Sequence, residues 1–344
     1  MSRLAPLIVD LEQPPEARWA GLAPHAAAVR ELCATYLEDL GGLDEYGLAL
    51  ALFETQCVPA GTRAELDAVA ALAGLPHAEV ALANLYYDAM KVAFSGLLGC
   101  TAVAVETPAG PLHARNLDWH APNDVLGRLT QLTELRRGDA LVARTVGWPG
   151  FVGAFSGVAP GRFALSLNAV LSEEAPRLAP SIALLLRDVL ERAPSFDAAL
   201  ERLAESEIAS DCLLLLTGTA PGERVVIERT PTRYALRRSE GPLVVTNDYR
   251  ALEGGGAAGL LGATACARFD RAAELAAGGL DPEAAFALLS DDAVRIARAE
   301  LAAYDGDAGM ASEKLIEHAL KRHADDNVSV MVVCLNLATV VERA

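Results

Sequence analysis

The pattern of apolar residues changes at Cys100, and this change limits the folds that the chain can adopt. From Pro24 to about Met90, apolar residues recur at three- and four-residue spacing, which is typical of amphipathic helices. The expected helices cover residues 25–40, 45–55, 64–74 and 77–90. After Cys100, short runs typical of β-strands dominate. The sequence therefore predicts a helical N-terminal region followed by an α+β region.

The α+β region is expected to hold strands on both sides of a helical pair. The strands cover 100–106, 111–115, 141–147, 162–170, 211–218, 223–230, 233–238, 243–247 and 327–337, and the helical pair covers 181–193 and 196–206. A further helical stretch precedes the last strand. This grouping indicates antiparallel sheets covered by helices, and it leaves open whether the sheets form one sandwich or two separate modules.

The composition excludes several classes of protein. A chain of 344 residues can bury a sizeable core without disulfides or metal ions. Acidic residues outnumber basic ones 46 to 29, and the net charge of -17 repels nucleic acid, so no nucleic-acid partner is expected. The first twenty residues lack the basic start and continuous apolar core of a secretory signal, and no segment reaches the roughly 20 apolar residues of a membrane span. We expect a cytoplasmic protein without a transmembrane segment.

One of the six cysteines stands apart from the others. No CxxC pair and no metal-ligand spacing occurs, so no metal site is expected. Cys100 begins the run CTAVAVE, which is followed by the turn TPAG and a second strand that ends in HARNLDW. Such a hairpin brings Cys100 near Arg115 and Asp118. An arginine favours the reactive thiolate and an aspartate can orient an amine, although a buried thiol beside a surface ion pair fits these residues equally well.

The stretch Cys100–Trp119 resembles the start of the catalytic chain in acid ceramidases and N-acylethanolamine acid amidases. There a Cys-Thr start is followed by His-Gly-Arg-Asn-(Leu/Met)-Asp, which reads HARNLD here. Bile-salt hydrolases and acyltransferases of penicillin biosynthesis are similar, and all belong to the N-terminal-nucleophile superfamily. The resemblance extends upstream to Pro14–Trp19 and Ala81–Asp88. It implies an αββα sandwich of two mainly antiparallel sheets, preceded by a small helical region.

The resemblance also implies the remaining site residues. The segment that ends in LSLNA resembles the region supplying an oxyanion-hole asparagine, which corresponds to Asn168. LVVTND resembles the segment with a second catalytic asparagine, which corresponds to Asn247. The candidate for the late arginine of the superfamily is Arg268 in ACARFDR, although that segment equally fits an ordinary helix face with Arg271 exposed.

Cleavage between Gly99 and Cys100 is a further implication of the resemblance. It would give chains 1–99 and 100–344 that stay associated, and it would free an α-amine. The reference pKa of such an amine, roughly 7.7–8.0, suits a general base. A papain-like cysteine–histidine pair is the rival mechanism, because His113 and His120 flank the Arg-Asn-Leu-Asp segment and His113 could face the same side as Arg115.

The expected activity is hydrolysis of a small-molecule N-acyl amide, without a cofactor. Resemblance points to fatty-acyl amides such as N-acylethanolamines. The alternatives are an acyltransferase, an amidase for acylated amino acids, β-lactams or bile-salt-like conjugates, and a catalytically silent relative that binds an acyl ligand. The apolar segment Met90–Leu98 could line an acyl site or form a lid, or simply pack against the sheet. Transient membrane contact stays open.

Overall fold

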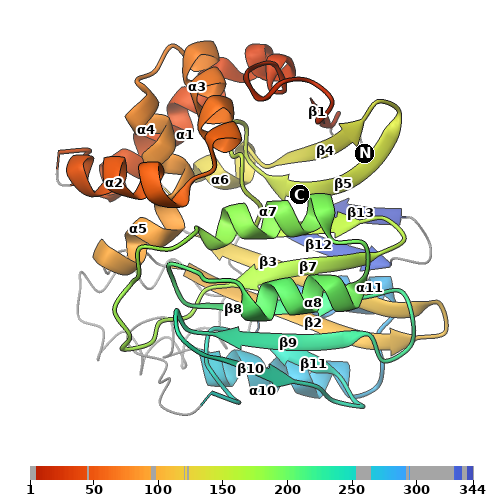
Figure 1. Ribbon diagram of the computed structural model, residues 1–344. Coiled ribbons are helices and arrows are strands. Elements are labelled where there is room, and N and C mark those ends of the chain that lie inside the picture. Colours follow the sequence, from red (N-terminus) through yellow and green to blue (C-terminus); the bar gives the residue numbers. More distant parts are fainter. Residues whose placement is uncertain are drawn as a thin grey trace.

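Two β-sheets pack face to face in the computed structural model, and helices cover both outer faces (Figure 1). The structure describes residues 5–44, 46–93, 98–119, 121, 124–252, 265–291, 294, 329–334 and 339–343. One sheet has the strand order β1 (Leu7–Asp10), β4 (Gln131–Arg137), β5 (Ala140–Gly147), β6 (Ser156–Ala159), β7 (Phe163–Asn168), β8 (Cys212–Thr217), β9 (Arg224–Arg229), β10 (Tyr234–Arg237). The other has the order β11 (Leu243–Val245), β2 (Leu98–Thr107), β3 (Gly110–Trp119), β12 (Ser329–Cys334), β13 (Thr339–Arg343). All these strand pairs are antiparallel except β1 with β4.

The order of layers is helix, sheet, sheet, helix. Helices α7 (Ile182–Arg192) and α8 (Phe196–Glu205) cover the eight-stranded sheet, and α10 (Ala265–Ala276) and α11 (Pro282–Leu289) cover the five-stranded sheet (Figure 1). Side chains alternate along the strands: Leu214 of β8 faces the helical layer, and Leu213 and Leu215 face the other sheet. The expected αββα sandwich is confirmed, and the two sheets form one sandwich rather than separate modules.

The helical N-terminal region packs on the same hydrophobic core. It contains the 3₁₀ turns η1 (Pro15–Ala17) and η2 (Ala20–His25) and the helices α1 (Ala26–Asp39), α2 (Gly47–Cys57), α3 (Ala60–Ala73), α4 (His77–Asn84) and α5 (Tyr86–Ala93). Its β1 adds a strand to the eight-stranded sheet. The Glu65 carboxylate of α3 accepts a hydrogen bond from the Trp19 indole at 2.8 Å and pairs with Arg187 of α7 at 2.5 Å. The N-terminal region is thus joined to the sandwich by backbone pairing, apolar contacts and a buried ion pair.

The predicted single helix over 77–90 is wrong, because the chain breaks it into α4 and α5 at Leu85. The cause is Asn84, whose amide donates to the Gly150 carbonyl at 3.1 Å and accepts from the Val152 N–H at 2.7 Å. These are contacts with a distant segment that no local pattern reveals. Among the described residues no single helix is long and apolar enough to span a membrane; α3 and α4 meet that criterion only when taken together, and they are bent by 119°.

Most expected strands and helices are present, but four strands are additional. These are β1, β4, β6 and β13, together with the short helix α6 (Val125–Arg128). The four-residue strands β1 and β6 are too short for a periodic signal, and β1 pairs with a strand that lies far along the chain. The expected helical stretch before the last strand includes α10 and α11, and residues 295–328 lie outside the described residues.

Candidate active site

The hairpin of β2 and β3 places Cys100 beside its sequence-distant neighbours. Pro108 and Ala109 form the turn, and the register pairs Cys100 with Leu117, Ala102 with Arg115 and Gly99 with Asp118. Paired residues on antiparallel strands point to the same face. The side chains of Cys100 and Arg115 therefore face the other sheet, and Asp118 faces the layer of α10 and α11.

Arg115 contacts the thiol between the two sheets. Its Nη2 lies 3.6 Å from Cys100 Sγ and donates to the Leu167 carbonyl at 2.7 Å, and Nη1 donates to Ser156 Oγ at 2.8 Å. The Arg115 side chain is buried, which lowers the pKa of its guanidinium, while the charges of Cys100 and Asp118 raise that pKa. A positively charged side chain thus stands next to a buried thiol.

The backbone of Cys100 is held by Asn247 and Arg268. The Cys100 N–H donates to Asn247 Oδ1 at 2.9 Å, and Arg268 Nη2 donates to the same oxygen at 2.6 Å. Arg268 Nη1 donates to the Cys100 carbonyl at 2.6 Å and to Thr101 Oγ1 at 3.1 Å. Arg268 is therefore buried at the site, and Arg271 on the outer face of α10 pairs with Asp291 at 2.8 Å.

The two asparagines use their amide groups differently. Asn168 Nδ2 donates to the carbonyls of Val245 and Thr246, both at 3.0 Å, so both of its N–H groups have protein acceptors. Asn247 Nδ2 donates one N–H to the Ala169 carbonyl at 2.7 Å. Its Oδ1 faces two donors and its Nδ2 faces an acceptor, which fixes the orientation of the amide.

Asp118 and Arg268 provide opposite charges on the helical side of the hairpin. Asp118 is 3% exposed, and its position in the register is opposite Gly99, the residue before the cysteine. Burial lowers the pKa of Arg268, while the charges of Asp118, Cys100 and Asp248 raise it. One arginine thus lies on each face of the sheet at Cys100. The carboxylate of Asp118 lies across from Gly99, the residue before the cysteine.

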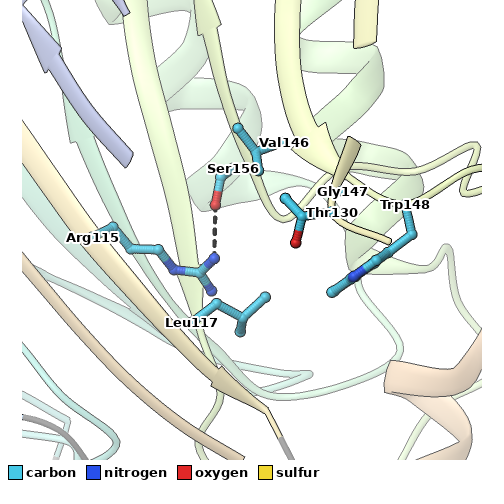
Figure 2. Close-up of a pocket in the computed structure, with 7 residues that line it drawn as sticks. All are labelled: Arg115, Leu117, Thr130, Val146, Gly147, Trp148 and Ser156. Carbon is cyan, nitrogen blue, oxygen red and sulfur yellow. Dashed lines mark hydrogen bonds between the residues drawn. The ribbon is translucent and has the colours of Figure 1, made fainter. Parts of the chain in front are cut away.

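A pocket opens on the thiol side of the hairpin. It is lined by Arg115, Leu117, Thr130, Val146, Gly147, Trp148 and Ser156 (Figure 2). In Figure 2 the Arg115 guanidinium lies on one side of the pocket and Trp148 on the other. The Trp148 indole is held by a hydrogen bond to the Leu126 carbonyl at 2.9 Å and by edge contact with Trp119. Both polar and apolar side chains line it, with Leu117 beside Arg115 and Thr130 on the side of Trp148.

The cysteine–histidine rival receives no support from the described residues. His113 faces the same side as Arg115, but its ring nitrogens lie 2.8 Å from Ser166 Oγ and 3.2 Å from Thr217 Oγ1. Burial, together with the charge of Arg115, lowers the pKa of His113 to about 3, which makes it a poor base near neutral pH. His120 lies outside the described residues, as do Phe94, Ser95, Gly96 and Leu97 of the apolar segment before the cysteine.

Within the described part of the chain, no group of three or more His, Cys, Asp or Glu is placed to hold a metal ion.

Two further residues belong to this arrangement and were not predicted. Ser156 holds the Arg115 guanidinium, and the carboxylate of Glu228 accepts hydrogen bonds from the segment that follows Asn247. A serine before a glycine and a glutamate inside ERVVIERT are ordinary sequence features. Their contacts depend on the packing of the two sheets, so no local signal could have revealed them.

The chain is similar to several known proteins. A model of the family described as acyl-coenzyme A:6-aminopenicillanic acid acyl-transferase matches residues 105–309. An acid ceramidase from Balaenoptera acutorostrata scammoni is 27% identical over 252 residues, which are 64% of this chain and 62% of the ceramidase. An N-acylethanolamine-hydrolyzing acid amidase from Caenorhabditis elegans is 27% identical over 177 residues, 48% of this chain and 50% of that protein. A solved structure of the orthologous amidase from the same organism has a TM-score of 0.49 and 18% identity, covering 70% of this chain and 94% of that one.

The αββα sandwich is the arrangement of the N-terminal-nucleophile superfamily, as the resemblance implied. The family model covers more than half of the chain, so the chain belongs to the acyl-coenzyme A:6-aminopenicillanic acid acyl-transferase family. The matched part spans 62% of the length of the ceramidase relative.

Proposed function

We propose that this chain is an amide hydrolase that cleaves itself between Gly99 and Cys100 and then uses Cys100 as the nucleophile. The observation that carries this proposal is the double restraint on Cys100. Its thiol lies 3.6 Å from a buried guanidinium, and its backbone nitrogen is held at 2.9 Å by Asn247. A structural cysteine needs neither contact, whereas a residue that supplies both a nucleophile and a base needs both groups placed.

The maturation step would be an attack of the Cys100 thiolate on the carbonyl carbon of Gly99. The peptide C–N bond breaks as the C–S bond forms, and the departing nitrogen takes a proton to become the α-amine of Cys100. Water then hydrolyses the thioester, leaving the carboxylate of Gly99 and regenerating the thiol. Gly99 has no side chain to obstruct the attack, and Asp118, the register partner of Gly99, would hold the new amine.

In the hydrolytic cycle, the Cys100 thiolate would attack the substrate carbonyl, and the α-amine would protonate the leaving amine. The same amine would then take a proton from water as the water attacks the thioester. The reference pKa of an α-amine, roughly 7.7–8.0, allows both roles near neutral pH. Arg115 stabilises the thiolate, and no proposed step requires a cofactor.

Asn247 is the better candidate for stabilising the oxyanion, and Asn168 is the better candidate for positioning. Both N–H groups of Asn168 Nδ2 are donated to the carbonyls of Val245 and Thr246. Asn247 Nδ2 donates to the Ala169 carbonyl, and among the described residues its second N–H has no hydrogen-bond acceptor. That N–H can bind an oxygen that becomes negative during the reaction.

The proposed substrates are N-acyl amides, with fatty-acyl amides such as N-acylethanolamines as the first group to test. Two relatives are named as a ceramidase and an N-acylethanolamine-hydrolyzing amidase, which supports this class. Leu117, Val146 and Trp148 are the apolar residues beside Arg115, and they would contact the part of the acyl group next to the reacting carbonyl.

The two products of self-cleavage would remain associated. Residues 1–99 contribute β1 to the eight-stranded sheet, the Glu65 carboxylate to an ion pair with Arg187, and the Tyr87 hydroxyl to the Asp211 carbonyl at 2.7 Å. These contacts bury apolar surface and a charge that each chain alone would expose.

Acyl transfer is a second candidate, because the matching family model is described as an acyltransferase. The thioester on Cys100 is common to both reactions, and the outcome depends on whether water or an amine attacks it. An added amine acceptor distinguishes the two: N-acylated acceptor accumulates if transfer competes, and free acid alone forms if water is the only acceptor.

Intact-mass measurement of the purified protein, combined with a panel of N-acyl amides, tests the proposal. We expect masses for Met1–Gly99 and Cys100–Ala344 and release of free acid from at least one amide. Cys100→Ala should remain uncut and inactive. An uncut wild-type chain that hydrolyses amides would contradict the proposed maturation, and turnover by the Cys100→Ala variant would contradict the proposed nucleophile.

A further inference from the structure

We infer that Glu228 is a positioning residue that sets the place of Asn247 through the segment Thr246–Leu252. This inference rests on the proposed function, because it gives Glu228 a role only if Asn247 acts on Cys100. Glu228 lies on β9 and is fully buried between the sheets. It is not part of the pattern that carries the resemblance to the amidases.

The Glu228 carboxylate binds three successive backbone N–H groups. Its Oε2 accepts from Arg250 at 2.9 Å, from Ala251 at 2.8 Å and from Leu252 at 3.0 Å. Its Oε1 accepts from Arg237 Nε at 3.3 Å. Three N–H groups converging on one oxygen form a concave anion site, and here the anion is supplied by the protein itself.

This contact fixes one end of the segment that carries Asn247, and other contacts fix the rest. Asn168 binds the carbonyls of Val245 and Thr246 before it, and the Tyr249 hydroxyl donates to the Arg229 carbonyl at 2.7 Å after it. Asn247 lies between these anchors, three residues before Arg250, which carries the first N–H that Glu228 holds. A shift of Arg250–Leu252 therefore moves the Asn247 amide relative to the nitrogen of Cys100.

The side chain must be a carboxylate for this role. Glutamine has one acceptor oxygen and one NH₂ group, so it cannot accept from both the backbone N–H groups and Arg237. Either the three N–H groups or the Arg237 guanidinium would face another donor inside the protein, which is unfavourable. Glu228→Gln should therefore displace the Thr246–Leu252 segment while changing the volume of the side chain very little.

The expected effect is on the reaction and not on the thiol itself. Misplacing a positioned group by about 1 Å costs on the order of 100-fold in rate, so we expect kcat and the rate of self-cleavage to fall about 10- to 100-fold in Glu228→Gln. KM should change less than about twofold, because the pocket residues lie on other strands. Alkylation of Cys100 by iodoacetamide should stay near the parent rate, since Arg115 and its partners are untouched.

The test is a double-mutant cycle with Asn247→Ala, read by self-cleavage and by turnover of an N-acylethanolamine. If Glu228 acts through Asn247, adding Glu228→Gln to Asn247→Ala should cause no further loss. The matched control is Glu65→Gln, which also removes a buried carboxylate with several donors; its effect should multiply with that of Asn247→Ala. Hydrogen exchange of the amides of Arg250, Ala251 and Leu252 gives a second measurement, and it should accelerate in Glu228→Gln and not in Glu65→Gln.

Three results would overturn the inference about Glu228. One is a multiplicative effect of Glu228→Gln and Asn247→Ala; another is normal cleavage despite faster exchange at residues 250–252. The third is a loss of self-cleavage and turnover in Glu65→Gln that is likewise absent when Glu65→Gln is added to Asn247→Ala. Such a result would reflect general destabilisation. An Asn247→Ala variant with parental activity is a separate result, because it would contradict the role of Asn247 in the proposed function.

Discussion

Replacing Asp88 with asparagine should stabilise the protein at neutral pH and have little effect near pH 4. Asp88 lies on α5, just before the cleavage segment, and its side chain is 7% exposed. Burial raises the pKa of this carboxyl from 3.8 to about 6, and the nearby hydroxyls of Ser181 and Ser210 lower it only in part. Among the described residues, neither the two carboxylate oxygens of Asp88 nor the hydroxyl oxygens of Ser181 and Ser210 make a well-aligned hydrogen bond.

The magnitude follows from the difference between the folded and unfolded states. Because the folded protein binds the Asp88 proton more tightly, the stabilisation from this group is complete below pH 3.8 and is lost as the pH rises through about 6. The gap between 3.8 and about 6 corresponds to about 3 kcal/mol, an upper value that relaxation around the carboxylate reduces. Asparagine is isosteric and uncharged, so the variant does not have this pH-dependent loss.

The assay is urea unfolding of Asp88→Asn and its parent between pH 4 and pH 8, both in the Cys100→Ala background so that the chain stays uncut. The free energy of unfolding of Asp88→Asn minus that of its parent should grow by roughly 2–3 kcal/mol from pH 4 to pH 8. A difference that stays flat or shrinks with rising pH would refute the reasoning. Glu65→Gln provides a control of opposite sign: burial of Glu65 raises its pKa, but the charge and hydrogen bonds of Arg187 and the bonds from Trp19 and Arg18 outweigh burial and lower it. Its destabilisation should therefore be largest at neutral pH and decrease on acidification.

Three other predictions concern the hairpin and the sheet behind it. Arg115→Ala removes the charge 3.6 Å from Cys100 Sγ, so alkylation by iodoacetamide near pH 7 should slow by about tenfold or more; an unchanged rate would mean that this arginine does not stabilise the thiolate. Asp118→Ala should reduce amide hydrolysis far more than alkylation, because only hydrolysis needs a placed amine, and equal losses in the two assays would contradict that role. Gly157→Ala would place a Cβ 2.5 Å from Leu190 Cδ1 and 3.0 Å from the Arg144 carbonyl, so urea unfolding should show a loss of about 1–3 kcal/mol; a loss below about 0.5 kcal/mol would show that the layer repacks freely.

The hairpin could be predicted from the sequence because its determinants are local. TPAG is a turn, the flanking runs are strand-like, and the register then places Cys100, Arg115 and Asp118 within a few residues of the same strand ends. The layers of helix and sheet follow in the same way from the spacing of apolar residues. The resemblance to known amidases added Asn168, Asn247 and Arg268, for which no local pattern exists.

Contacts between distant segments could not be predicted. The break between α4 and α5 results from hydrogen bonds of Asn84 with Gly150 and Val152, and the pairing of β1 with β4 joins strands separated by more than a hundred residues. The contacts of Glu228 could not be predicted either, because the run ERVVIERT does not show that its second glutamate points between the sheets. In each case the packing of the complete fold, and not local propensity, determines where a polar side chain finds its partners.

The central claim is that Cys100 becomes a new chain start and the nucleophile, and one measurement tests it most directly. The purified protein is treated with an N-acyl amide carrying a chromophore on the amine, quenched in acid during turnover, and analysed by intact mass. We predict two chains, Met1–Gly99 and Cys100–Ala344, with the mass of the acyl group added only to the second chain and, after digestion, only to the peptide that begins with Cys100. An acyl group found on any other residue, or turnover by a chain that is never cut, would contradict the account.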